Sequence, residues 1–188
     1  MTAHGATTAR VRVPVKTIDR DRYFPQFISS IANKISRGGS RVYLQLFGIG
    51  IIEWRILSVL AHNPKSTANV ICNTIDLDKA AASRSIQVLE QLGYVATATD
   101  PGDGRKRSVS LTPAGQALHD RAIKVALQRE QQLLVGFDDH EREVLLGLLR
   151  RMHANAVEMD SFDYATLDPA PAISQPARAR RKHDAHAA

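Results

Sequence analysis

The fold of this chain is decided by residues 78–115, which read DKAAASRSIQVLEQLGYVATATDPGDGRKRSVSLTPAG. The first part predicts a helix over residues 79–92, with Asp78 as its N-terminal cap. Gly93 follows as a typical C-terminal stop, because glycine readily adopts the left-handed conformation that ends many helices. One face of this helix is apolar, at spacings of three and four: Ala82, Ile86 and Leu89.

From Tyr94 the pattern changes to alternation, which is typical of β-strands. Residues 94–99 and 108–111 alternate, and residues 100–104 between them are rich in aspartate, proline and glycine. Such a composition favours a tight turn. The sequence therefore predicts a β-hairpin whose tip carries three consecutive basic residues: Arg105, Lys106 and Arg107.

Two further helices are predicted after the hairpin. Thr112 caps and Pro113 opens a long helix that runs to about Val135. A D-x-x-E pattern at Asp138 is typical of a capping box, and it predicts a last helix that ends near Asp160.

Apolar residues at helical spacing also predict three helices upstream, over residues 23–47, 51–62 and 67–75. Either Ser66 or Thr67 caps the third of these helices. Gly38 and Gly39 lie inside the first helix, where glycine disfavours the helical conformation. They indicate either a kink or a place where another group approaches the backbone closely.

The composition bounds the class of protein. The 188 residues are 44% hydrophobic and 23% charged, which is ordinary for a globular domain with appendages. No apolar run is long enough for a membrane-spanning helix, and no secretory signal is apparent at the N-terminus. Cys72 is the single cysteine, so we expect neither a disulfide framework nor a cysteine-rich zinc site. We expect a cytoplasmic protein without a membrane partner.

The basic excess is unevenly distributed. The net charge is +6, yet residues 51–112 hold seven basic and six acidic residues. Any polyanion partner must therefore be recognised by the placement of charges rather than by their number. Residues 1–21 are predicted to be a flexible arm, and the Pro/Ala-rich residues 161–188 a disordered tail.

The order of elements describes a winged helix-turn-helix: a helix, a short turn, a capped helix and a basic hairpin. A helix fits the major groove of DNA, and its N-terminal half presents side chains to base edges. A wing beside it places basic side chains at the narrower minor groove. Ser83, Arg84 and Gln87 lie opposite the apolar stripe, while Ala80 and Ala81 allow a close approach to the bases.

At these residues the chain resembles the MarR-type (multiple antibiotic resistance regulator) transcriptional regulators. Residues 47–49 and 53–57 are similar to the start of the second helix of that family. The resemblance covers residues 22–160 and is carried mainly by four segments: 78–84, 89–95, 103–105 and 111–115.

The resemblance implies a mainly α fold with six helices and one β-hairpin wing. Residues 22–160 would form one MarR-like domain, with the winged helix-turn-helix at about 51–112. The dimerisation helices would lie at about residues 22–47 and 113–160. A homodimer would then read a pseudo-palindromic double-stranded DNA operator, with half-sites about 34–36 Å apart.

Roles in DNA binding follow position by position from the resemblance. Arg105 matches the wing arginine of the minor groove and Asp103 its orienting partner, although Asp103 is also an ordinary turn residue. Arg84 matches a groove-facing position, or it instead contacts a phosphate or pairs within its own helix. Ala80 and Ala81 replace hydroxyl residues that many members carry. The expected DNA-binding set is Lys79, Ala80, Ala81, Ser83, Arg84, Gln87, Asp103, Arg105, Lys106 and Arg107.

Residues 36–49 look most like members that control the catabolism of aromatic compounds. This similarity implies a small aromatic carboxylate, or its thioester, as effector. The candidate effector-binding residues are Arg41, Tyr43, Trp54 and His62. Each has a plainer interpretation: Trp54 as core, Arg41 as an ion-pair partner and His62 as a residue at a helix C-terminus.

We therefore expect a DNA-binding repressor that an aromatic effector releases from its operator, and not an enzyme. No nucleophile elbow, phosphate-binding glycine loop or metal-ligand spacing is present in the sequence, so we expect no cofactor and no metal. Three alternatives stay open. They are a redox-responsive regulator that uses Cys72, an effector-independent regulator, and a winged-helix module that binds proteins.

Overall fold

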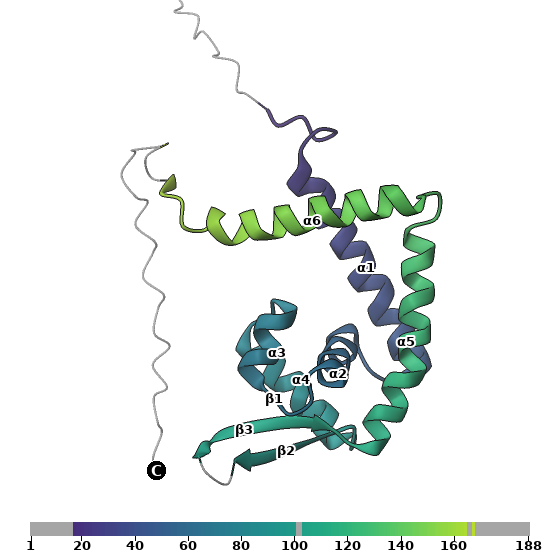
Figure 1. The fold of residues 1–188 in the computed structure, drawn as a ribbon, viewed down its shortest axis with the longest axis vertical. Helices are drawn as coiled ribbons and strands as arrows, with labels where there is room; N and C mark the ends of the chain where they lie inside the picture. The colour runs from purple at the N-terminus through teal and green to yellow at the C-terminus, as the bar shows by residue number, and fades with distance from the viewer. Residues whose placement is uncertain (1–16, 101–102, 165–166, 168–188) are drawn as a thin grey trace, which may run out of the picture. The chain divides into compact units, whose positions relative to one another are not determined.

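The computed structural model describes residues 17–100, 103–164 and 167, apart from the side chains of residues 100 and 103–106. The chain divides into two compact units, Met1–Leu133 and Leu134–Ala188. Six helices and one small sheet within the described ranges confirm the predicted mainly α class. The elements are α1 (Phe24–Phe47), α2 (Ile51–His62), β1 (Ser66–Thr67), α3 (Ala68–Ile75), α4 (Lys79–Gln91), β2 (Val95–Asp100), β3 (Asp103–Leu111), α5 (Pro113–Leu133) and α6 (Asp139–Met159) (Figure 1).

The predicted arm over residues 1–21 and the predicted tail over residues 161–188 lie mostly outside the described residues. At the start of the tail the chain continues as a turn after α6. The hydroxyl of Tyr164 donates to the carbonyl of Met159 at 3.1 Å, and the ring of Phe162 packs edge-on against Tyr164. None of the described helices is by itself long and apolar enough to cross a membrane; α1 and α2, bent by 79° at their junction, pass that test only as a pair.

α3 and α4 begin where their capping side chains predict. The carboxylate of Asp78 accepts a hydrogen bond from the N–H of Ala81 at 2.9 Å. The hydroxyl of Thr67 accepts from the N–H of Val70 at 3.4 Å, so Thr67 and not Ser66 caps α3. These bonds satisfy backbone donors that the first turn of a helix cannot pair internally.

Ser66 belongs instead to a strand that the sequence did not reveal. The sheet is antiparallel with the order β1-β3-β2, and Ser66 and Thr67 pair with Val109 and Ser108 of β3. The predicted two-stranded wing therefore has a third strand. A two-residue strand is too short to show alternation, and this one forms only because β3 passes beside it.

The core of the first unit lies between α2, α3, α4 and the sheet. Ile56 and Leu57 of α2, Ile71 of α3 and Leu89 of α4 are completely buried. Val109 fills the same core from β3. Figure 1 shows α2, α3 and α4 grouped along one side of the β2–β3 hairpin. The helical spacing had predicted that α4 buries the face bearing Leu89, and this is confirmed.

One junction holds α4, the hairpin and α5 together. The hydroxyl of Thr112 donates to the carbonyl of Gly93 at 2.6 Å and accepts from the N–H of Gly115 at 3.1 Å. The N–H of Thr112 donates to the carbonyl of Tyr94 at 3.0 Å. Gly93 itself adopts a φ of +75°, which favours glycine. The end of α4 and the start of α5 are therefore joined through a single threonine.

Gly115 allows this junction to close. A β-carbon at this position would overlap the backbone carbonyl of Tyr94. Backbone on both sides leaves no flexible side chain to give way, so only glycine fits here. The L-T-x-x-G sequence thus has a steric reason in addition to the Thr112 cap.

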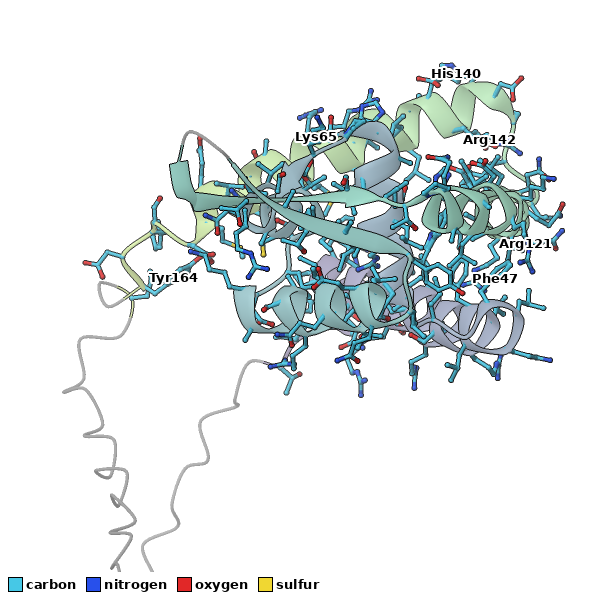
Figure 2. The ribbon with its side chains drawn as sticks, turned by 90° about the horizontal axis from the view of Figure 1, so that it is seen from below. Phe47, Lys65, Arg121, His140, Arg142 and Tyr164 are labelled. Atoms are coloured by element: carbon cyan, nitrogen blue, oxygen red, sulfur yellow. The ribbon has the colours of Figure 1, made fainter. Side chains whose placement is uncertain are left out.

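Stacked rings join α1, α2 and α5. Trp54 of α2 lies between Tyr43 of α1, with ring centroids 5.4 Å apart, and His119 of α5, with centroids 5.5 Å apart. Phe47 extends the stack beside Tyr43, and Figure 2 shows Arg121 next to Phe47, with its guanidinium carbon 5.5 Å from the ring centroid. Such offset aromatic pairs add to the stabilisation from buried area.

Asp120 fixes the outer end of this stack. Its carboxylate lies 3.2 Å from Nδ1 of His119 and accepts from the amide of Gln116 at 2.8 Å. These hydrogen bonds, with that to His119 the stronger cause, lower the pKa of the Asp120 carboxyl. The orientation of the His119 ring is therefore linked to the ionisation of an exposed carboxylate.

In the second unit, α6 begins with the predicted capping box. Asp138 accepts from the N–H of Glu141 at 2.8 Å, and the Glu141 carboxylate accepts from the N–H of Asp138 at 2.9 Å. Arg142 donates to the carbonyl of Phe137 at 3.1 Å and so fixes the turn before the helix.

Large apolar side chains remain exposed on three helices of the single chain. On α1 they include Phe24, Phe27 and Ile31, and on α6 Leu148 and Leu149, all at least two fifths exposed. α5 adds exposed leucines in its second half. Large apolar side chains exposed in such numbers along a helix favour an interaction surface.

The Gly115→Ala substitution is expected to lower the free energy of unfolding by about 2–4 kcal/mol, because the added methyl group meets backbone that cannot move aside. The matched control is Ala117→Gly at an exposed position of the same helix, which loses only helix propensity, about 1 kcal/mol. Urea unfolding of both variants measures the difference. Equal losses would contradict the steric explanation.

Asp120→Asn is expected to change the pH dependence of stability. Because the pKa of this carboxyl is lowered in the folded state, its contribution is present above the unfolded pKa of about 3.9 and is lost as pH falls through the lower folded value. The difference in unfolding free energy between wild type and Asp120→Asn should therefore shrink below pH 4. Gln116→Leu, which removes one donor, should weaken the effect. Parallel stability curves for wild type and Asp120→Asn would argue against it.

Candidate nucleic-acid interface

α4 presents a polar face away from the core. Ser83, Arg84 and Gln87 are exposed, and so is Lys79 at the start of the helix. Ala80 is exposed and Ala81 half-buried. The opposite face is closed against the core by four buried residues: Ala82, Ser85, Ile86 and Leu89. The structure therefore brings the α4 members of the predicted DNA-binding set onto one accessible surface.

The chemistry of this face suits base edges and phosphates. An arginine guanidinium can bond guanine through two parallel hydrogen bonds, and a glutamine amide can do the same with adenine. The two alanines add no donors, and their small size keeps the helix backbone accessible. Lys79 lies in the first turn, where a compact positive charge is suited to a phosphate.

The hairpin supplies the second part of the interface. Arg107 is exposed on β3, where it pairs in register with Thr99 of β2. The backbone of Asp103, Arg105 and Lys106 also belongs to β3. The side chains of those three residues lie outside the described part of the structure, so the predicted Asp103–Arg105 pairing stays a prediction.

Glu90 is the acidic residue of α4, and its side chain bonds to the hairpin. Its carboxylate accepts a hydrogen bond from the N–H of Thr97 in β2 at 3.3 Å. This contact ties the C-terminal half of α4 to the wing and keeps a negative charge away from the N-terminal half. The L-E-x-x-G segment thus positions the wing relative to the helix.

Two of the four predicted effector residues lie together. Tyr43 and Trp54 are 2% and 8% exposed and stack on each other, which favours the core interpretation of Trp54. Burial raises the pKa of the Tyr43 phenol, and the nearby charge of Arg129 partly opposes the shift. His119 completes the stack and was missed, because it is separated from Trp54 by 65 positions and stands alone in the sequence.

The other two predicted effector residues lie elsewhere. His62 is exposed at the end of α2, eight residues and so about 12 Å along the helix from Trp54. Arg41 is exposed on α1 and lines a surface hollow with Lys34 and Arg37. Arg41 and Tyr43 are two positions apart, about 200° around the helix, so their side chains leave α1 on roughly opposite faces.

Cys72 and the possible metal-binding side chains were the remaining candidates for a functional site. Cys72 is 4% exposed on the inner face of α3. A small buried residue is the ordinary structural role of a free cysteine. Among the described residues, no group of three or more histidine, cysteine or carboxylate side chains is placed to hold a metal ion.

Comparisons with known proteins agree with this geometry. A family model described as MarR family matches residues 47–106. The crystal structure of a MarR/EmrR family transcriptional regulator from Acinetobacter sp. ADP1 is 36% identical, with a TM-score of 0.71, and the match covers 75% of this chain and 99% of that chain.

Two curated proteins are also similar over part of their length. The putative transcriptional regulatory protein for the hcr operon of Thauera aromatica is 28% identical over 98 residues, which are 52% of this chain and 59% of that protein. The HTH-type transcriptional repressor NicR of Pseudomonas putida is 36% identical over 91 residues, 48% of this chain and 57% of NicR. This chain thus matches less than two thirds of the length of either protein.

The match to the Acinetobacter regulator covers three quarters of this chain and nearly the whole of that chain. The family model covers the segment from the end of α1 to the hairpin tip, where the polar face of α4 and the basic strand lie. On this similarity, the chain belongs to the MarR family of transcriptional regulators, which are not enzymes.

Proposed function

We propose that the protein is a homodimeric, sequence-specific DNA-binding repressor. The single observation that carries this proposal is the surface of α4: one face completes the core, and the other exposes Arg84 and Gln87 beside a basic hairpin. A helix with this division of faces fits the major groove, where its side chains reach base edges. The partner is double-stranded DNA that carries a pseudo-palindromic operator.

Within this interface the roles differ. Arg84, Ser83 and Gln87 read bases, while Lys79 and Arg107 contact phosphates and set the position of the helix in the groove. Arg105 enters the minor groove beside the main site, and Asp103 orients its guanidinium through charged hydrogen bonds. The roles of Arg105 and Asp103 rest on the D-x-R sequence of the wing.

The homodimer is supported by the apolar surface that the single chain leaves open. Phe24, Phe27 and Ile31 on α1 are 71%, 49% and 49% exposed, and α5 and α6 carry further exposed leucines. A second copy offers the same apolar faces, and an interface between identical surfaces closes as a two-fold dimer. The two copies of the winged helix-turn-helix at about residues 51–112, which we call the head, would then read the two halves of the operator.

The proposal also states that the protein represses transcription and that an effector releases it from the operator. Repression is supported by the name of NicR as a transcriptional repressor. A small aromatic carboxylate or its thioester is supported by the similarity of residues 36–49 to regulators of aromatic catabolism. The buried stack of Tyr43 and Trp54 joins α1 to the head, so a ligand that separates these rings would move the head relative to α1.

The alternatives have less support. A redox-responsive regulator would need an accessible thiol, and Cys72 is buried in α3. A protein-interaction module would not need an outward arginine and glutamine on the helix next to a wing with three consecutive basic residues.

Gel-shift titration with the DNA upstream of the protein's own gene tests the DNA-binding proposal. Arg84→Ala and Arg105→Ala should each weaken binding by about 1–3 kcal/mol and relax the preference at one operator position. Lys79→Ala should weaken binding to all sequences alike and reduce the salt dependence, because it removes a phosphate contact. Binding without salt sensitivity or sequence preference would contradict the proposal.

Sedimentation of Ile31→Glu tests the dimer. Ile31 is 49% exposed in the single chain, so the glutamate should leave the folded monomer intact but dissociate the dimer. The matched control is Val70→Glu on α3, at a position 45% exposed, which should leave the dimer intact. A dimeric Ile31→Glu variant would place the interface elsewhere.

A further inference from the structure

The hairpin of β2 and β3, which forms the wing, is attached to α4 at two levels along its length. The first attachment is at its base, where the N–H of Thr112 donates to the carbonyl of Tyr94 at 3.0 Å, just after α4 ends. The second lies three residues further along β2, where the N–H of Thr97 donates to the carboxylate of Glu90 at 3.3 Å. At about 3.3 Å of rise per residue, the two attachments are about 10 Å apart along the strand.

The N–H of Thr97 is available to Glu90 because β2 lies at the edge of the sheet. The strand order is β1-β3-β2, so within the described part of the chain one side of β2 has no neighbouring strand. Successive N–H groups of an antiparallel strand point alternately to its two sides. That of Thr97 points to the open side, and Glu90 accepts its hydrogen bond there. A side chain of α4 thus pairs a backbone group that an edge strand leaves free.

The opposite side of the wing is held at the same level. Val109 of β3 pairs with Thr97 on one side and with Ser66 of β1 on the other. Thr67, next to Ser66, caps α3, and α3 is followed by α4. These contacts form a closed ring through β1, α3, α4, β2 and β3. Glu90 closes the ring through a side chain, whereas strand pairing and the continuous chain make the other links.

The tip of the wing lies beyond the Glu90 attachment. The pairing of β2 with β3 becomes irregular between Thr99 and Asp100. Asp100 is six residues from Tyr94, so it lies about 20 Å along the strand, twice as far from the base as Thr97. A tilt about the base that moves Thr97 by about 1 Å therefore moves the tip by about 2 Å, which exceeds the range of hydrogen-bond lengths.

The charge of Glu90 is unfavourable for DNA binding in general. A carboxylate close to a phosphate backbone repels it, so a neutral residue at this position would raise the affinity for any sequence. A carboxylate is nevertheless a stronger acceptor for an N–H group than a neutral oxygen is. Glutamate therefore weakens general affinity and strengthens the attachment of the wing. Such a balance favours discrimination between partners over affinity.

We propose that Glu90 is a positioning residue for sequence recognition, which orients the wing relative to α4 so that both read the operator in one register, without touching DNA itself. This inference rests on the proposed function and deepens it, because it names what sets the specificity under the wing. Discrimination at the operator positions below the wing then depends on Glu90. Discrimination at the positions that Arg84 and Gln87 read does not.

Amide hydrogen exchange of the full chain without DNA tests the attachment itself. Glu90→Met removes the acceptor but keeps the length and helix propensity of the side chain. Glu90→Gln keeps one acceptor oxygen and removes the charge. The Thr97 amide should exchange about fivefold faster in Glu90→Met, as expected for the loss of one ordinary hydrogen bond, and close to the wild-type rate in Glu90→Gln. The Thr99 amide on the same strand is the internal reference and should keep its rate.

Gel-shift titration tests the effect on recognition, with the operator and two altered operators. One carries a base change under α4, and the other an A·T to G·C change under the wing, which alters the width of the minor groove. Glu90→Met should lower the discrimination at the wing position about fivefold and leave that at the α4 position unchanged. Glu90→Gln should keep both and bind all three DNAs more tightly. The matched control Glu130→Gln removes an exposed charge from α5 and should behave as wild type.

Four results would overturn the inference. The first is an equal Thr97 exchange rate in wild type and Glu90→Met. The second is full discrimination at the wing position by Glu90→Met. The third is an equal loss at both operator positions, which would indicate a general effect on the fold of the head. The fourth is a loss in Glu90→Gln as large as in Glu90→Met, which would make the charge and not the hydrogen bond responsible.

The same experiments separate this inference from the proposed function. A sequence-specific shift by wild type that is indifferent to Glu90 would leave the regulator standing and overturn the positioning role. Thr97 exchange that depends on Glu90, in a protein that shifts no DNA, would support the attachment of the wing and overturn the DNA-binding proposal.

Discussion

The head depends on one steric constraint, the contact of Gly115 with the backbone of Tyr94. Through it the first turn of α5 meets the third residue after α4, and Thr112 bonds both sides of the junction. If α5 could not approach so closely, the end of the hairpin and the end of α4 would no longer be held together. The position of α4, and of Arg84 on it, relative to the wing therefore depends on a junction outside the candidate interface.

The sequence alone predicted most of the short-range structure. The caps at Asp78 and Asp138, the left-handed Gly93 and the buried face of α4 each depend on residues at most a few positions apart, and each is found as predicted. The family resemblance rests on the same segments. Short-range rules succeed there because the partners lie within one turn of helix or one hairpin.

What the sequence did not reveal depends on distant partners. β1 exists because β3 lies beside it, and His119 has a role only when α5 packs against α2. Arg129 bonds a carbonyl 94 positions earlier in the chain. The periodic pattern of apolar residues in a sequence does not indicate which distant residues contact each other. For the candidate interface, spacing predicted which side chains of α4 point outward, whereas base preference depends on an arrangement of donors relative to DNA that spacing does not contain.

The ring stack has a practical consequence. Trp54 is the sole tryptophan of the chain, and it lies between a phenol and an imidazole supplied by two other helices. Its emission therefore reports directly on whether α1, α2 and α5 remain packed together. The protein carries its own optical probe at the place where the head joins the long helices, and a change of state can be followed without attaching a dye.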